Sequence, residues 1–217
     1  MHIKRKAIPK FWPVPKSGTK YLAVPVHEQR NSVPLIMALR DMLKFVKTKK
    51  ELKKLLNEKK IEVNKKVRME LNYPIALFDT LSMPSIKKHY RAVLDNKRIS
   101  LVPIEEKEAG IRIYKLIGKK VLPNKKIQLN FNLGNNILSS DKIKIGDFAV
   151  FDNTKNKILE ILPLKKETKV VVIGGKHIGK MGKIKELVNE GRNLIAKIEA
   201  EDKTEISTHV KNLFIMN

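Results

Sequence analysis

The sequence contains no cysteine, few aromatic residues and no long apolar run. Without cysteine, the 217 residues exclude disulfide frameworks and thiolate zinc sites. No metal site is expected either, because metal-ligand spacing is missing among the five histidines, which are His2, His27, His89, His177 and His209. No apolar stretch approaches the roughly 20 residues that span a bilayer. No signal-peptide core follows the basic first residues, so a soluble cytoplasmic protein is the expectation.

Acidic residues are also in short supply. The chain has 46 Lys plus Arg against 22 Asp plus Glu, a net charge of +24. Such a charge implies a polyanionic partner, with nucleic acid ahead of an anionic membrane. The excess is concentrated, since residues 44–68 hold eleven basic and three acidic residues, whereas residues 184–217 hold five basic and six acidic. A solvated lysine-rich surface is the alternative interpretation.

Residues 1–34 read as a basic, proline-rich arm. Four prolines between residues 9 and 25 disfavour a helix or a central strand, so the arm is expected to be disordered until it meets RNA. The aromatic pair Phe11–Trp12 has two interpretations. It can stack on nucleic-acid bases, or it can anchor the arm to the protein's own core.

Two helices and a hairpin are predicted next. Residues 35–47 carry apolar side chains at helical spacing. Thr48 and Glu51 form a capping box that starts a second helix over residues 49–60. That helix buries a leucine stripe and covers its other faces with lysines. Residues 61–70 alternate around Asn64-Lys65-Lys66, which predicts two short strands joined by a turn.

From residue 99 to about 165 the pattern changes to short alternating runs separated by Pro, Gly and Asn, which indicates a small β domain. Asp147 and Asp152 are interpreted there as turn residues rather than catalytic acids, because no suitable base accompanies them.

The segment GGKHIGKM, residues 174–181, is one letter away from a Walker A loop. Its glycines and Lys180 have the required spacing, but Met181 replaces the metal-binding hydroxyl. Gly182 then stands where a helix should propagate, at a cost of about 1 kcal/mol relative to Ala. We therefore expect no NTPase. A strand over 170–173 and two further strands downstream indicate an all-β module with four tight-turn glycines, namely Gly174, Gly175, Gly179 and Gly182.

Three stretches resemble ribosomal modules. Residues 169–187 look like a KOW motif, with its hallmark glycine at Gly182. Residues 48–70 resemble the alpha-L RNA-binding motif of the fourth bacterial small-subunit ribosomal protein and of pseudouridine synthases. Glu58-Lys59-Lys60 departs from it, because a glycine is usual at that turn. The start, His2-Ile3-Lys4-Arg5 with Pro9, Trp12 and Val14, is similar to the amino-terminal signature of the archaeal and eukaryotic S4e ribosomal family.

The order of these modules covers essentially the whole chain, which is identified as a member of that family. The resemblance implies an α+β, multi-domain fold. Its expected parts are an arm (1–34), a helical-hairpin alpha-L domain (35–98), a central β domain (99–166) and an SH3-like KOW barrel (167–217).

The resemblance also implies a non-enzymatic structural constituent of the small ribosomal subunit, in the cytoplasm. Its partners would be small-subunit rRNA and neighbouring ribosomal proteins, with no cofactor, membrane or small-molecule substrate. One alternative is an RNA-modifying enzyme of the pseudouridine-synthase type, although the Gly-Arg-Leu-Asp stretch of such enzymes is missing. The other is a transcription-associated KOW protein.

The predicted RNA contacts fall in three places. In the arm they are Lys4, Arg5, Lys6, Lys10 and Trp12. In the alpha-L motif they are Lys49, Lys50, Lys53, Lys54, Lys59, Lys60, Lys65 and Lys66. In the KOW loop they are Lys176, His177, Lys180 and Lys183.

Overall fold

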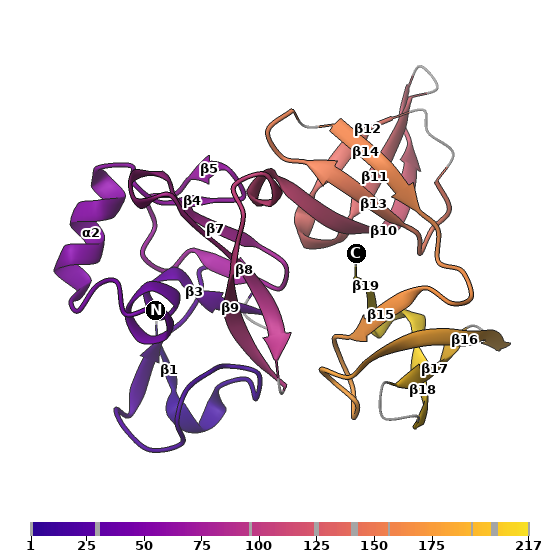
Figure 1. The fold of residues 1–217 in the computed structure, drawn as a ribbon, viewed down its shortest axis with the longest axis horizontal. Helices are drawn as coiled ribbons and strands as arrows, with labels where there is room; N and C mark the ends of the chain where they lie inside the picture. Colours follow the sequence, from indigo (N-terminus) through magenta and orange to yellow (C-terminus); the bar gives the residue numbers. More distant parts are fainter. Residues whose placement is uncertain are drawn as a thin grey trace. The chain divides into compact units, whose positions relative to one another are not determined.

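The computed structural model describes the chain apart from residues 1, 29–30, 96, 124–125, 140–142, 156, 192, 201–203 and 217. It consists mostly of β-strands with few helical turns (Figure 1). The chain divides into two compact units. Unit 1 comprises Met1–Arg112 with Asp152–Lys155, and unit 2 comprises Ile113–Phe151 with Asn156–Asn217.

Unit 1 is built around a five-stranded antiparallel sheet in the order β5-β4-β7-β8-β9. Its strands are β4 (Glu62–Val63), β5 (Lys66–Val67), β7 (Thr80–Met83), β8 (Lys88–Asp95) and β9 (Arg98–Ile104). A separate pair joins β3 (Ser32–Pro34) to β6 (Pro74–Ala76). The expected domain boundary at residue 98 instead falls inside β9, because β9 pairs with β8 along its whole length.

The first predicted helix is shorter than its apolar spacing indicated. Helix α1 (Leu35–Met37) continues into a π-helical turn, η2 (Ala38–Met42), and ends there rather than at residue 47. Lys44 then adopts a left-handed φ of 55°, which turns the chain away from the helix axis. Val46 is still buried in the core. The apolar spacing therefore predicted the burial of this residue correctly, but it placed the end of the helix wrongly.

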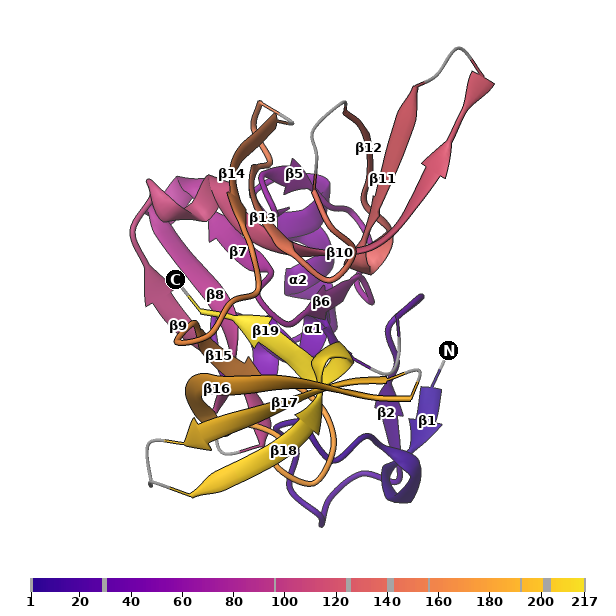
Figure 2. The ribbon, with the colours of Figure 1, turned by 90° about the vertical axis from the view of Figure 1, so that its right-hand side faces the viewer.

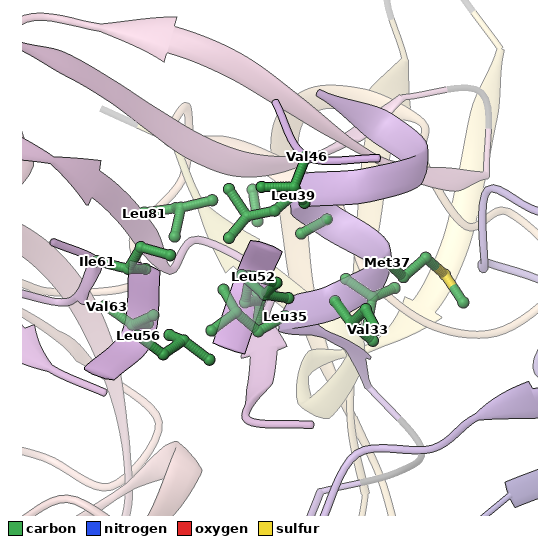
Figure 3. Packing of buried hydrophobic residues seen from close by; sticks show 14 of the residues in the cluster. Val33, Leu35, Met37, Leu39, Val46, Leu52, Leu56, Ile61, Val63 and Leu81 are labelled. Carbon is green, nitrogen blue, oxygen red and sulfur yellow. The ribbon is translucent and has the colours of Figure 1, made fainter. Parts of the chain in front are cut away.

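Helix α2 (Lys49–Asn57) confirms the predicted cap. The Glu51 amide donates to Thr48 Oγ1 at 3.2 Å, and the Glu51 carboxylate accepts from the Lys47 amide at 2.9 Å. The hydrogen bond from the Lys47 amide, and after it one from the Thr48 side chain, lower the pKa of the Glu51 carboxyl. Leu52 and Leu56 are fully buried against side chains of the neighbouring elements, including Leu35, Ile61 and Val63 (Figure 3). Each such leucine stabilises the unit by roughly 1.5–3 kcal/mol, and together they fix which face of α2 points to solvent.

The amino-terminal segment is folded onto unit 1. Strand β1 (His2–Lys4) pairs with β2 (Tyr21–Ala23), and a 3-10 turn, η1 (Arg5–Ala7), follows β1. Trp12 is only 2% exposed, and its indole N–H donates to the Ser32 carbonyl at 3.0 Å. The expectation of a disordered arm does not hold in this structure, because Trp12 buries its ring in the unit's own core.

The first sheet of unit 2 has the order β12-β11-β10-β13-β14. Its strands are β10 (Ile111–Val121), β11 (Ile127–Phe131), β12 (Asn136–Leu138), β13 (Phe148–Asp152) and β14 (Lys157–Leu162). Tyr114, Leu129 and Phe131 lie in its core. Asp147 is a turn residue, as predicted, and its carboxylate accepts from the Lys144 amide. Asp152 is instead the last residue of β13, and its carboxylate accepts from the Thr154 amide in the turn that follows.

The second sheet of unit 2 has the order β18-β17-β16-β15-β19, and its strands are labelled in Figure 2. Its strands are β15 (Lys169–Val172), β16 (Met181–Glu190), β17 (Asn193–Ala200), β18 (Glu205–His209) and β19 (Leu213–Ile215). All four pairings are antiparallel. The predicted strand–loop–strand and the following hairpin are therefore confirmed. Four short 3-10 turns complete the elements named here: η3 (Pro84–Ile86), η4 (Glu108–Gly110), η6 (Asn132–Gly134) and η7 (Val210–Asn212).

Candidate nucleic-acid interface

The solvent face of α2 is a dense group of cations. Lys49, Lys50, Lys53 and Lys54 are all exposed, and in the described part of the chain no ion pair engages them. Lys49 with Lys53, and Lys50 with Lys54, are like charges four residues apart, which costs a helix about 0.2–0.5 kcal/mol per pair. Lys49 and Lys50 also sit in the first turn, where the helix dipole disfavours cations. This face is therefore poorly arranged for helix stability and well arranged to meet a polyanion.

The turn after α2 ends the helix with a Schellman motif. The Lys60 amide donates to the Leu55 carbonyl at 3.2 Å, and the Lys59 amide donates to the Leu56 carbonyl at 3.0 Å. Lys59 occupies the left-handed position of this motif with φ 54°, where glycine is usual. A left-handed φ costs an L-residue roughly 1–2 kcal/mol. The Glu58 carboxylate lies 2.6 Å from Lys60 Nζ, and this contact lowers the pKa of Glu58.

The tip of the β4–β5 hairpin is held rigidly. Asn64 and Lys65 have φ values of 54° and 61°, the combination of a type I′ turn. The Asn64 side chain donates through Nδ2 to Asp79 Oδ1 at 2.6 Å, and its Oδ1 accepts from the Thr80 backbone N–H at 3.0 Å. Asp79 also forms a buried ion pair with Arg112. The hairpin therefore presents half-buried Lys65 and exposed Lys66 on a fixed backbone.

The arm contributes only part of its predicted set. Lys4, Lys6 and Lys10 are exposed. The Arg5 guanidinium donates to the Thr19 carbonyl at 2.7 Å and the Pro15 carbonyl at 2.6 Å, so it closes the loop beneath it. Trp12 leaves the RNA-binding set, because a ring with 2% of its surface exposed has no face on which a base can stack.

The loop between β15 and β16 carries three of the remaining predicted contacts, and Lys183 follows them within β16. Lys176 and Lys183 are exposed, while His177 and Lys180 are half-buried. The Val172 amide donates to the Lys180 carbonyl at 3.0 Å, and the Gly179 amide donates to the Val172 carbonyl at 2.8 Å. A strand rather than a helix follows, so the loop lacks the free helix amides on which a Walker A site depends.

The four glycines of this loop do not share one role. Gly175 and Gly179 have φ values of 92° and 86°, which confirms them as tight-turn positions. Gly174 instead lies against Asn212, whose Oδ1 would be 3.1 Å from an added Cβ. Gly182 was wrongly predicted as a turn residue. It lies within β16, where a Cβ would come within 2.9 Å of Ala200 Cα on the neighbouring strand, so it permits close strand approach.

Two features outside these groups bear on other kinds of site. Among the described residues, no helix has the length and apolarity to cross a membrane. In the same residues, no three His, Cys, Asp or Glu side chains gather where they could hold a metal ion.

Comparison with known proteins decides the family. The chain is 35% identical over 190 residues to small ribosomal subunit protein eS4 of Methanocella arvoryzae, covering 86% of this chain and 80% of that protein. The chain belongs to the ribosomal S4e family. Residues 86–158 match the model described as ribosomal family S4e. The eS4 protein of Nanoarchaeum equitans is 33% identical over 192 residues, with 86% and 82% of the two chains covered.

A solved structure shows the same fold. The crystal structure of the 30S ribosomal protein S4e from Thermoplasma acidophilum superposes with a TM-score of 0.71 at 24% identity. The match covers 86% of this chain and 95% of that chain. The S4e assignment made from sequence motifs is thus confirmed, and the β-rich architecture is that of an S4e protein.

Several lysines of this S4e chain that could contact RNA lie outside the sequence motifs. Nine described non-glycine residues have a positive φ, and five of them are lysines, namely Lys44, Lys59, Lys65, Lys87 and Lys97. Lys44, Lys87 and Lys97 lie outside the predicted contacts. No local pattern marks them, because their backbone conformation depends on how the strands around them pair.

Proposed function

We propose that this S4e protein is a non-enzymatic structural constituent of the small ribosomal subunit, located in the cytoplasm, that binds small-subunit rRNA. The observation that carries the proposal is the solvent face of α2, where four exposed lysines are retained at a cost to helix stability. The named eS4 relatives support this assignment over an RNA-modifying enzyme or a transcription-associated KOW protein.

The proposed mechanism uses three groups of contacts. The alpha-L part lays Lys49, Lys50, Lys53 and Lys54 along RNA phosphates, with the turn and hairpin lysines beside them. The arm adds Lys4, Lys6 and Lys10, and the KOW loop adds Lys176, His177, Lys180 and Lys183. Lysine ammonium groups act as point charges, so they supply affinity and register rather than base selection. Neighbouring ribosomal proteins are proposed as further partners.

Binding to a small-subunit rRNA transcript across a salt series tests the proposal. About ten phosphate contacts predict a slope of log affinity against log salt of roughly −7 to −9, because each contact releases counterions. A slope shallower than about −3 contradicts the proposal, as does measurable nucleotide turnover.

The α2 contribution is isolated with two matched variants. Changing Lys49, Lys50, Lys53 and Lys54 to Gln should make the slope shallower by about 3, since four contacts are lost. The control changes four exposed lysines outside α2 to Gln and removes the same net charge. They are Lys119, Lys120 and Lys157 of unit 2 and Lys155 of the short unit 1 segment. Equal losses in the two variants would show that only the total charge matters, and would refute a specific α2 interface.

A further inference from the structure

Two turns that carry lysines lie at the same end of the unit 1 sheet. Glu62 of β4 pairs with Ser82 of β7, and Ser82 pairs with His89 of β8. The residues just before β4, Lys59 and Lys60, therefore lie at the same sheet end as the β7–β8 turn, which contains Lys87 and leads into Lys88. Strand β7 lies between β4 and β8 in the sheet (Figure 1). Two strand spacings amount to about 10 Å.

The two turns share an unusual backbone feature. Lys59 has φ 54° at the end of α2, and Lys87 has φ 52° at the end of η3, with its amide donating to the Pro84 carbonyl at 3.1 Å. Glycine would occupy both positions without steric cost. Lysine occupies both positions in this chain, although neither its backbone preference nor a side-chain hydrogen bond or ion pair with a described residue favours it there.

The charges of Lys59 and Lys87 are available. Both side chains are exposed, and neither makes a side-chain hydrogen bond or ion pair to a described residue. Their neighbours differ, because Lys60 Nζ is paired with Glu58 and Lys88 Nζ lies 5.1 Å from the Phe45 ring centroid. The ammonium groups of the two left-handed lysines are therefore available to a partner outside the described chain.

We propose that Lys59 and Lys87 form a phosphate-binding pair for the backbone of a bound RNA. This inference rests on the proposed rRNA-binding function and adds the β7–β8 turn, which the sequence motifs do not include. Each left-handed turn places an exposed lysine at this sheet end, and the cost of the left-handed backbone is offset when the phosphate binds. Two cations at one sheet end, carried by turns whose strands are two strand spacings apart, can contact separate phosphates of one strand or of a duplex.

The test uses the full-length protein with Lys59→Gly, Lys87→Gly and the double substitution. Relief of the left-handed strain should raise the thermal midpoint of the free protein, by roughly 2–4 °C per position. Loss of two phosphate contacts should make the salt slope for rRNA transcript binding shallower by about 1.5 and lower the affinity at 100 mM salt by roughly tenfold or more. A variant that is both more stable and weaker in binding is the expected result.

The matched control is Lys97→Gly. Lys97 is also exposed and left-handed, with φ 65°, but it follows β8 at the opposite end of that strand. It should show the same rise in midpoint with a salt slope within about 0.3 of the wild type. If Lys87→Gly binds as Lys97→Gly does while the wild type keeps a steep slope, the pair is refuted and the proposed function stands. If the wild type itself ignores the transcript, the proposed function fails first.

Discussion

Trp12 and Gly182 each fix the packing of one segment against its neighbour. Trp12 fills the core of unit 1 and satisfies the Ser32 carbonyl, while the Phe11 carbonyl accepts from the Ile99 amide at 2.9 Å. These contacts attach the amino-terminal segment to β3 through Ser32 and to β9 through Ile99. Gly182 works in the opposite way, since it is the absence of a side chain that lets β16 lie close to β17.

The burial of Trp12 can be measured by its own fluorescence, because it is the only tryptophan in the sequence. Its fluorescence in the free protein should be blue-shifted and poorly quenched by iodide, as expected for a buried indole, and should change little when rRNA transcript is added. Trp12→Phe should lower the free energy of unfolding by roughly 1–3 kcal/mol through lost area and a lost hydrogen bond. It should leave the salt slope unchanged. Strong quenching by added RNA would instead restore the base-stacking role.

Gly182→Ala should destabilise unit 2 by roughly 1–3 kcal/mol or more, because the added methyl overlaps the backbone of β17 and the strands must separate. Denaturant unfolding measures this. Gly118→Ala is the control, since it also lies in a strand but an added Cβ there meets nothing within 4 Å. Similar losses in the two variants would show that strand glycines as such, rather than the close approach, set the cost.

At the scale of elements, the two sheets of unit 2 are joined by the half-buried amine of Lys115. Lys115 on β10 donates through Nζ to the Val210 carbonyl and, at 3.2 Å, to the Leu213 carbonyl. Phe148 on β13 meets Phe214 on β19 edge to face, with ring centroids 5.2 Å apart. Burial lowers the pKa of the Lys115 ammonium to about 8. A neutral amine also donates hydrogen bonds, so both carbonyls stay satisfied after deprotonation.

This lowered pKa gives unit 2 a pH-dependent stability. In the unfolded chain the Lys115 pKa returns toward 10.5, so between about pH 8 and 10.5 the unfolded state binds more protons. The free energy of unfolding should therefore rise with pH across that window, by up to a few kcal/mol. Denaturant unfolding at pH 7.5, 8.5 and 9.5 measures it. Lys115→Met, which removes the titrating group, should be flatter over the same range, and a wild type as flat as this variant would contradict the assignment.

At the scale of the whole molecule, the net charge of +24 acts on folding and on binding in opposite directions. Cations that attract RNA repel one another in the free protein. Added salt screens both effects, since the Debye length falls from about 30 Å at 0.01 M to about 8 Å at 0.15 M.

The free protein should accordingly have a higher thermal midpoint at 0.3 M than at 0.01 M sodium chloride, by several degrees, while its affinity for rRNA transcript falls over the same range. Calorimetry and filter binding measure the two trends. A parallel series in sodium fluoride at equal ionic strength separates screening from ion-specific effects. A midpoint that falls with salt would show that self-repulsion does not limit stability.

The sequence by itself determined the features that depend on neighbouring residues. The Thr48–Glu51 cap, the inward leucines of α2, the Asn64–Lys65 turn and the strands around the glycine loop all follow from local spacing and turn chemistry. The same local motifs identified the S4e family, and the charge predicted the class of partner.

Only the tertiary structure decided features that require distant segments to meet. The burial of Trp12 depends on Ser32, the end of the first helix depends on how residues 43–46 return to the core, and β9 belongs to unit 1 because it pairs with β8. Strand register likewise brings Lys59 and Lys87 to one sheet end and brings Gly182 against β17. A pairing between strands is a contact between residues far apart in the chain, so no local periodicity carries it.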